Sequence, residues 1–172
     1  EVRQDFIPSD IEINVSEVLK LLNHFKDSYI RNNTLPLFNN SFEFDLFNTF
    51  RDYINLEKNY PVYLEKNSDE RGFFSFFLKA EIGGQFSYSI TLPGITRGNH
   101  FHTRKIERFI VLKGEAKISV RKIGSEKIYD FLLNGDQPSY IDMPIWYTHS
   151  ITNVGDEPLI TSFWINEPYD PN

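Results

Sequence analysis

The sequence predicts an all-β jelly-roll barrel preceded by two short α-helices. From about Tyr60 onward, short runs rich in aromatic and β-branched residues alternate with turn signals, which is typical of antiparallel strands. Aromatic residues make up 16% of the chain, with 16 Phe and 9 Tyr, and they suit strands whose inner faces fill a barrel. A chain of 172 residues can bury one main core but not two full enzyme domains. We therefore divide it into a lead-in, residues 1–60, and a barrel, residues 61–172.

Residues 1–60 have the periodicity of helices. Asn14 and Glu17 resemble a capping box, and a helix is expected over about 15–30. Ser41 is expected to cap a second helix. The buried faces are predicted to contain Val18, Leu22, Phe25 and Tyr29 in the first helix and Phe42, Leu46, Phe50 and Tyr53 in the second. Because such aromatic-rich helices need an apolar surface to cover, we expect residues 1–60 to form a homodimer.

Eight strands are expected after the helices. They are predicted at 73–80, 85–92, 106–112, 115–122, 126–133, 137–142, 147–153 and 158–166. Glycine-containing turns separate several of them, because glycine adopts the positive φ that tight reversals require. About eight antiparallel strands close naturally into a jelly roll.

Composition excludes several classes of protein. The formal net charge of −6 argues against a nucleic-acid-binding protein, which would need clustered Lys and Arg. Without cysteine, neither disulfides nor thiolate metal sites are possible, and a reducing cytoplasm is compatible. We find no apolar run long enough for a membrane span and no secretory leader, so a cytoplasmic location is expected. The chain also lacks a glycine-rich dinucleotide fingerprint, so no NAD(P) site is expected.

Three of the four histidines gather with a glutamate in two glycine-bounded segments. His100 and His102 are two residues apart, so on a strand both point to the same face, and Glu107 follows after a short turn. His149 can arrive from a strand distant in sequence. Three imidazoles and one carboxylate suit a divalent ion, with zinc expected and manganese, iron or nickel as alternatives. The alternative is a hydrogen-bonded polar cluster in a metal-free barrel.

The segment from Gly94 to Gly114 fits the pattern G-x5-H-x-H-x4-E-x6-G and resembles the metal-binding signature of the cupin superfamily. Asp69–Phe74 and Arg97–His100 resemble the D-x-R-G-x-F and R-G-x-H segments of nucleotide-sugar epimerases in that superfamily. The resemblance implies that Arg71 and Arg97 bind the diphosphate of a sugar nucleotide. In the second segment, Trp146 stands where the family pattern places glycine.

A narrower resemblance covers most of the chain. The stretch Pro93–His102, the stretch Pro144–His149 and the terminal segment Trp164–Asn172 are similar to the C-terminal cupin domain of bifunctional capsular-polysaccharide epimerase/reductases. The resemblance implies C3 epimerisation of a UDP-linked 2-acetamido-2,6-dideoxy-4-keto-hexose. It also implies a short-chain dehydrogenase domain in the full-length protein, which would reduce the product.

Two versions of the chemistry remain open at this point. In one, a metal held by His100, His102, Glu107 and His149 polarises the ketone. In the other, His100 is a free base and Tyr147 or Tyr88 donates the proton, because one imidazole nitrogen cannot be both metal ligand and proton acceptor. Alternative functions are a nucleotide-sugar 3,4-ketoisomerase, a non-catalytic metal-braced module for dimerisation or ligand sensing, and a small-molecule dioxygenase.

Overall fold

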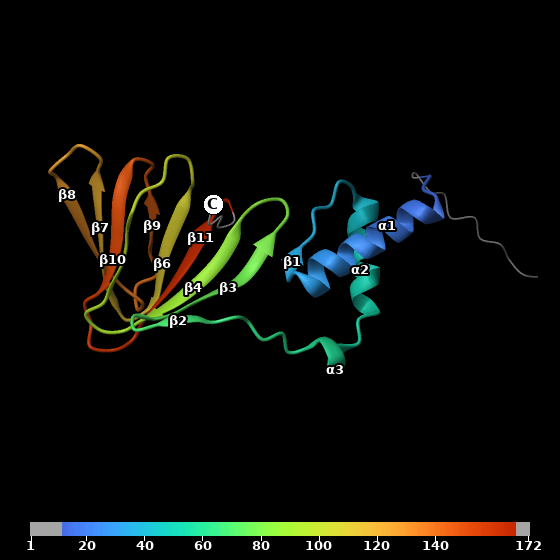
Figure 1. The fold of residues 1–172 in the computed structure, drawn as a ribbon, viewed down its shortest axis with the longest axis horizontal. Helices are drawn as coiled ribbons and strands as arrows, with labels where there is room; N and C mark the ends of the chain where they lie inside the picture. The colour runs from blue at the N-terminus through green and yellow to red at the C-terminus, as the bar shows by residue number, and fades with distance from the viewer. Residues whose placement is uncertain (1–11, 168–172) are drawn as a thin grey trace, which may run out of the picture. The chain divides into compact units, whose positions relative to one another are not determined.

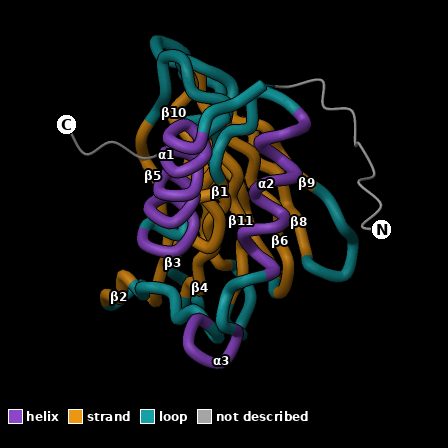
Figure 2. Tube along the Cα trace, turned by 90° about the vertical axis from the view of Figure 1, so that its right-hand side faces the viewer, coloured by secondary structure: helices purple, strands orange, loops and turns teal. Residues whose placement is uncertain are grey.

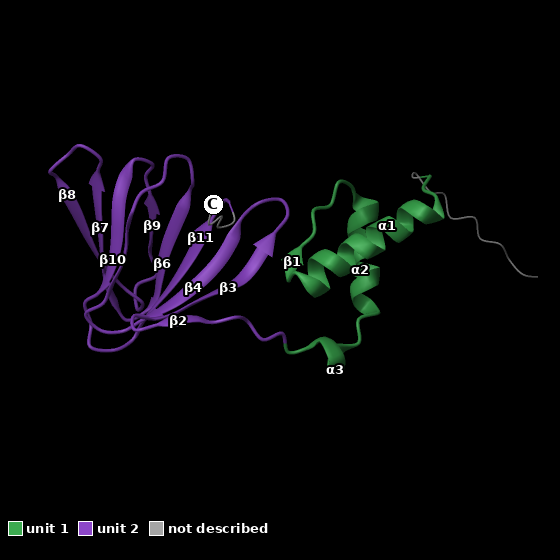
Figure 3. Ribbon diagram, in the orientation of Figure 1, with its two compact units in different colours: residues 1–61 green, residues 62–172 purple. Residues whose placement is uncertain are grey.

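The computed structural model describes residues 12–167. The chain divides into two compact units, Glu1–Pro61 and Val62–Asn172. Figure 3 colours the first unit green and the second purple. The last five residues of the terminal segment that carries the family resemblance, 168–172, lie outside the described residues.

The described part of the first unit is mostly helical. Its elements are α1 (Val15–Phe25), the π-helix η1 (Lys26–Arg31), the short extended β1 (Thr34–Leu35), α2 (Ser41–Asp52) and α3 (Leu56–Asn59). Both predicted helices are present, since η1 continues α1 to the end of the expected range. The core of this unit is aromatic: Phe25 is fully buried, and the rings of Phe47 and Phe50 lie 5.2 and 6.0 Å from it.

The capping box at the start of α1 is confirmed, because Asn14 Oδ1 accepts from the backbone N–H of Glu17 at 2.9 Å and the Glu17 carboxylate accepts from the Asn14 N–H at 3.1 Å. The predicted cap of α2 is wrong by one residue. Asn40, not Ser41, is the N-cap. The Asn40 side chain accepts a hydrogen bond from the backbone N–H of Glu43, three residues later.

The predicted buried face of α2 is also partly wrong. Phe47 is the buried residue of the helix, whereas Tyr53 is 85% exposed. The helix ends at Asp52 and Tyr53 is its C-cap, so helical periodicity no longer applies to the Tyr53 side chain.

The second unit is built from two antiparallel sheets. One has the order β3-β4-β11-β6-β9, with β2 pairing β3, and the other has the order β5-β10-β7-β8. Figure 1 shows β8, β7 and β10 side by side, and in Figure 2 the strands are orange and the helices purple. The strands are β2 (Asn67–Asp69), β3 (Gly72–Ala80), β4 (Gln85–Thr91), β5 (Thr96–His100), β6 (Glu107–Lys113), β7 (Glu115–Lys122), β8 (Ile128–Asn134), β9 (Tyr140–Met143), β10 (Tyr147–Asn153) and β11 (Leu159–Ile165).

All eight predicted strands are confirmed: β7 and β10 match the predicted ranges, and the ends of the others shift by at most three residues. Two strands of the second unit, β2 and β5, were not predicted. The three-residue β2 is too short to show a pattern, and β5 contains Arg97, Gly98 and Asn99, none of which favours a strand by composition. Backbone pairing with β10 is what makes β5 a strand.

The core of the barrel lies between the inner faces of the two sheets. Strands β6, β7 and β10 alternate buried and partly buried positions, as expected where one face packs inward. The buried apolar residues are Phe109, Val111, Ala116, Ile118, Val120, Met143, Ile151, Leu159 and Phe163. This packing fixes which side chains of each strand point into the barrel.

Among residues 12–167, no helix combines the length and the apolar character needed to cross a membrane.

Candidate metal centre

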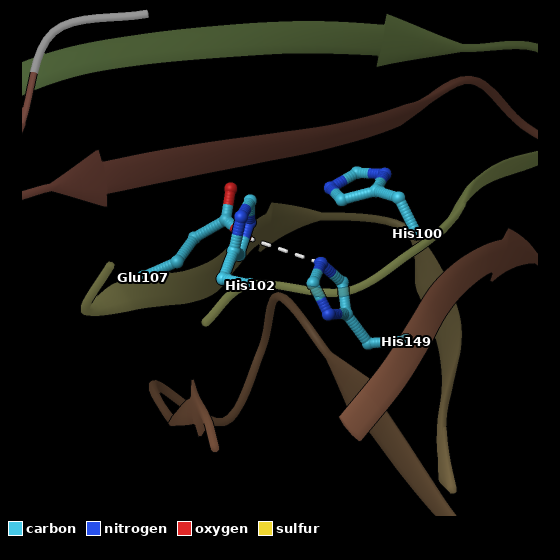
Figure 4. A group of neighbouring side chains, drawn as sticks. All are labelled: His100, His102, Glu107 and His149. Carbon is cyan, nitrogen blue, oxygen red and sulfur yellow. Dashed lines mark hydrogen bonds and ion pairs between the residues drawn. The ribbon is translucent and has the colours of Figure 1, made fainter. Parts of the chain in front are cut away.

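The four predicted ligand residues come together at one end of the barrel. His100 ends β5 directly opposite His149 of β10, Glu107 begins β6, and His102 lies in the loop between β5 and β6. One potential ligand atom from each residue lies within 4.8 Å of those of the other three. Figure 4 shows the side chains arriving from separate segments and pointing toward one another.

The route by which His100 and His102 meet differs from the prediction. Simple strand alternation was expected to align them, but β5 ends at His100 and His102 is in a loop. Their ring centroids still lie 5.1 Å apart. The loop is tied down by the backbone N–H of Trp146, which donates to the His102 carbonyl at 2.8 Å.

A bulge in β5 places Arg97 and His100 on the same face. The β5–β10 register shifts between His149 and Ser150, and Gly98 and Asn99 have φ values of 100° and 65°. A Cβ on Gly98 would lie 2.7 Å from the His149 carbonyl oxygen, so only glycine fits this close approach. The bulge therefore sets the direction of the His100 side chain.

Glu107 is the centre of the cluster's contacts. Its Oε2 lies 2.9 Å from His102 Nε2 and 3.1 Å from His149 Nε2. Burial opposes ionisation of the Glu107 carboxyl, but the neighbouring imidazoles of His149 and His102 outweigh it and hold the pKa of Glu107 below its ordinary value. The carboxylate is therefore the ionised form in which it can bind a cation.

His149 presents a buried nitrogen without a hydrogen-bond partner. Its side chain is fully buried, and the 3.1 Å approach of Nε2 to Glu107 is not aligned as a hydrogen bond. Nδ1 lies 3.4 Å from the Tyr147 carbonyl, which can accept a hydrogen bond from it in the tautomer that carries the proton on Nδ1. In that tautomer, Nε2 offers a lone pair to a cation that the Glu107 carboxylate can also bind.

The donor set fits a divalent ion. Two donors about 2.1 Å from one ion and about 90–110° apart lie about 3.0–3.4 Å from each other. The contacts of 2.9 and 3.1 Å at Glu107 Oε2 are close to that separation. Imidazole nitrogen with carboxylate oxygen suits zinc, manganese, iron or nickel.

His100 differs from the other three members. It is exposed, whereas His102 and Glu107 are partly buried and His149 is buried. Partial burial, together with the neighbouring imidazole of His149, lowers the pKa of His100, so its ring is neutral at pH 7. A neutral imidazole at the open side of the cluster can bind a metal or accept a proton.

The two candidate tyrosines lie on opposite faces of the barrel wall. Tyr147 is two residues before His149 on β10 and packs against the core, so it shares the inner face. Tyr88 lies on the outer face of β4, where its ring contacts Phe73 and Phe77, while Ser87 and Ser89 are buried on the inner face. The structure brings Tyr147, and not Tyr88, to the side of the sheet that holds the imidazoles.

The two candidate arginines both approach the carboxylate of Asp69, which the sequence did not indicate as their partner. Arg71 donates to Asp69 from Nε at 2.9 Å, and Arg97 Nη2 lies 3.9 Å from the same carboxylate. Arg71 and Arg97 hold the pKa of Asp69 below its ordinary value. Arg97 is largely buried and donates to Thr91 Oγ1 at 2.9 Å, whereas the Arg71 side chain is 46% exposed. Arg71 is the more accessible of the two cations.

Phe109 was also missed. Its ring meets the His149 ring edge-on at 5.6 Å and is 4% exposed, so it forms the apolar floor beneath the cluster. A buried Phe within a strand gives no sequence signal for this role.

Comparison with known proteins assigns the family. Residues 67–172 match the model of the polysaccharide biosynthesis C-terminal domain. The chain belongs to this family. The crystal structure of the capsular polysaccharide assembling protein CapF from Staphylococcus aureus aligns with a TM-score of 0.85 and 38% identity, over 93% of this chain and 43% of that chain. The predicted family resemblance is confirmed, and so is the cupin barrel.

A curated relative agrees with this assignment. The UDP-2-acetamido-2,6-beta-L-arabino-hexul-4-ose reductase of Pseudomonas aeruginosa is 32% identical over 92% of this chain and 42% of the relative. The cupin domain of Drosophila melanogaster CENP-C shares the fold, with a TM-score of 0.50 at 18% identity over 58% of this chain and 73% of that chain. The chain thus spans less than half the length of these two longer relatives, the reductase and CapF.

Proposed function

We propose that this chain is a metal-binding cupin domain that catalyses C3 epimerisation of a UDP-linked 2-acetamido-2,6-dideoxy-4-keto-hexose in the synthesis of surface-polysaccharide precursors. The observation that carries the proposal is the convergence of three imidazoles on one ionised carboxylate, with a buried, unpartnered nitrogen on His149. The relatives, a hexulose reductase and a capsular polysaccharide assembling protein, indicate the proposed class of substrate.

His102, Glu107 and His149 form the firm part of the proposed metal set, because His102 and His149 both contact the Glu107 carboxylate. A divalent ion bound there, zinc in the first instance, would act as a Lewis acid toward the ketone oxygen of the substrate. His100 either completes the set or acts as the base. Its exposure and its neutral ring suit it to face the substrate.

The proposed reaction needs one group to remove the C3 proton and another to return a proton from the opposite face. His100 accepts the proton, and the electrons of the C3–H bond move into the enolate. Tyr147, on the inner face of β10, is the proposed donor to the other face of C3. Tyr88 is left out of this proposal because its ring packs on Phe73 and Phe77 outside the barrel.

Arg71 and Arg97 are the proposed binding groups for the diphosphate. A guanidinium can bind two oxygens at once. Arg71 has the exposure to do so, after exchanging its contact with Asp69 for a phosphate oxygen. Arg97 is tied to Thr91, so its proposed part is to supply charge beside Arg71.

The remaining parts of the proposal concern the whole protein. The relatives are more than twice the length of the matched region, and we propose that a short-chain dehydrogenase domain in the full-length protein reduces the epimerised product. We also propose that residues 1–60 contribute to a homodimer and that the reaction takes place in the cytoplasm.

The test is hydrogen exchange. The zinc-loaded protein is incubated with the 4-keto sugar nucleotide in D₂O, and deuterium at C3 is followed by NMR. We expect incorporation at C3 with inversion. No exchange with zinc, manganese, iron or nickel would contradict the proposal. A product with its carbonyl at C3 would instead identify a ketoisomerase.

His100→Gln separates the two roles of His100. If His100 is the base, this variant keeps stoichiometric zinc and loses exchange. If His100 is a required ligand, zinc binding and exchange are lost together. For a non-catalytic module, replacing His102 by Ala would lower the melting temperature (Tm) of the zinc-loaded protein, and the wild type would show no exchange.

A further inference from the structure

The backbone of Trp146 is in a conformation that bulky residues rarely adopt. Its φ is +64°, and the other non-glycine residues with positive φ in the described part of the chain are Asn33 and Asn99. Asparagine tolerates this region well, whereas for a large aromatic residue it is a genuine outlier. Such strain persists only where the surroundings hold it, and it clusters at functional sites.

Three contacts hold Trp146 in place. Its N–H donates to the His102 carbonyl at 2.8 Å, and its own carbonyl accepts from the N–H of Ile123 at 2.9 Å. Its ring is stacked on Phe101, with centroids 6.1 Å apart and planes 28° apart. Phe101 directly precedes His102, so the ring contact and the backbone contact flank the same imidazole.

These contacts replace the support that a strand would give. The other two histidines of the cluster, His100 and His149, are held by the β5–β10 ladder, but His102 lies beyond the end of β5. Phe101 and Trp146 are 44% and 49% exposed, so their stacking adds little to the core. The arrangement is better explained by the loop that it immobilises.

We propose that Trp146 is a positioning residue that, with Phe101, clamps the loop carrying His102 so that its Nε2 is directed at Glu107 and the ion. This inference rests on the proposed metal centre and adds to it a residue that binds neither metal nor substrate. Supports of this kind around a metal site commonly affect metal affinity by about 10–100-fold.

Trp146→Gly isolates the ring, because glycine adopts a φ of +64° without strain and keeps both backbone hydrogen-bonding groups. Phe101→Ala removes the stacking partner from the other side, and Trp146→Phe keeps an aromatic ring. The matched control is Phe131→Ala, since Phe131 is 42% exposed on β8, which carries none of the four candidate ligands.

The measurement is zinc affinity, by competition with a chromophoric chelator, alongside the melting temperature of the metal-free proteins. We expect Trp146→Gly and Phe101→Ala each to weaken zinc binding by about tenfold. The double variant should be no weaker than either single variant, because the two rings act as one unit. Trp146→Phe and Phe131→Ala should bind zinc as the wild type does, and metal-free Trp146→Gly should melt no lower than the wild type, because glycine relieves the backbone strain at this φ.

Unchanged zinc affinity in Trp146→Gly would overturn the clamp, and so would an equal loss in Phe131→Ala. A fall in zinc affinity matched by a fall in metal-free melting temperature would assign Trp146 a purely structural role and also overturn it. If the wild type itself binds no stoichiometric ion, the metal centre fails, which is a different result from an intact centre that is indifferent to Trp146.

Discussion

The two ends of the barrel differ in chemistry although the same strands connect them. Glu107 of β6 and His149 of β10 lie at one end of the barrel, which we call the histidine end. The turns that follow these two strands lie at the other end, which we call the far end. The far end has a cavity of about 600 Å³ whose charged lining residues are Lys113, Glu115, Asp136, Asp156 and Glu157. The histidine end gathers three imidazoles and one carboxylate within 4.8 Å.

Buried ligand atoms that converge therefore indicate a candidate metal site better than the volume of a cavity does. At the far end the charges are solvated, and the pair Lys113–Glu157 is 3.5 Å apart with both side chains about two-thirds exposed. Such a pair contributes little. At the histidine end the fully buried His149 Nε2 lies 3.1 Å from the Glu107 carboxylate and has no hydrogen-bond partner.

The largest effect, on stability, is expected from truncating a buried apolar side chain near each end of the barrel. Phe109→Ala and Leu159→Ala both truncate buried side chains, and each should lower the free energy of unfolding of the metal-free protein by about 3–5 kcal/mol. Only Phe109 contacts His149, so only Phe109→Ala should also weaken zinc binding, by about tenfold. Urea unfolding and chelator competition measure the two quantities. Equal loss of zinc affinity in both variants would erase the distinction between the ends.

The next effect concerns the carboxylates. Glu107→Gln removes the one anionic donor of the cluster and should weaken zinc binding by more than about 100-fold. Glu115→Gln removes an acidic group from the far cavity and should leave zinc binding unchanged. Isothermal titration with zinc distinguishes the outcomes. Weaker binding in Glu115→Gln would mean that the far end holds the ion.

A third pair of variants tests the bulge. Gly94→Ala and Gly98→Ala both place Ala at positive φ, at an expected cost of about 1–2 kcal/mol. A Cβ on Gly94 meets nothing within 4 Å, whereas on Gly98 it would lie 2.7 Å from the His149 carbonyl and would force β5 away from β10. Gly98→Ala should therefore also weaken zinc binding about tenfold, because His100 and His149 separate. If Gly94→Ala weakens zinc binding equally, the close approach at Gly98 is not what aligns the two histidines.

The strands and the composition of the cluster could be predicted from sequence because both depend on local patterns. Alternation and glycine turns located all eight predicted strands, and the spacing of the histidines with Glu107 singled out a group whose donor atoms converge. Caps are local too, but Asn40 and Ser41 are both good capping residues, and the choice depended on reaching Glu43.

What could not be predicted depends on pairing across the fold. Strand β5 forms because β10 pairs with it, and its bulge turns Arg97 and His100 to one face three residues apart, which no two-residue alternation allows. Tyr88 points outward because its neighbours Ser87 and Ser89 occupy the inner face of β4, an orientation that hydrophobicity alone would not indicate. These outcomes are set by tertiary packing, which overrides local preference.

The smallest effect is a pH dependence at the outer surface of the histidine end. Arg108 Nε donates to Asp142 at 2.7 Å and holds the pKa of Asp142 below its ordinary value. A depressed folded-state pKa gives stability that is present above the unfolded pKa of about 3.9 and is lost as pH falls through the folded pKa. Asp142→Asn should therefore lower the Tm by about 1 °C at pH 5–8, and the difference should shrink as the pH falls below the unfolded pKa. Glu157→Gln at the far end should not change the Tm measurably, since the Lys113–Glu157 pair is more exposed. Thermal melts at a series of pH values measure both variants. If Glu157→Gln lowered the Tm as much as Asp142→Asn, the greater exposure of the Lys113–Glu157 pair would not make its contribution to stability smaller.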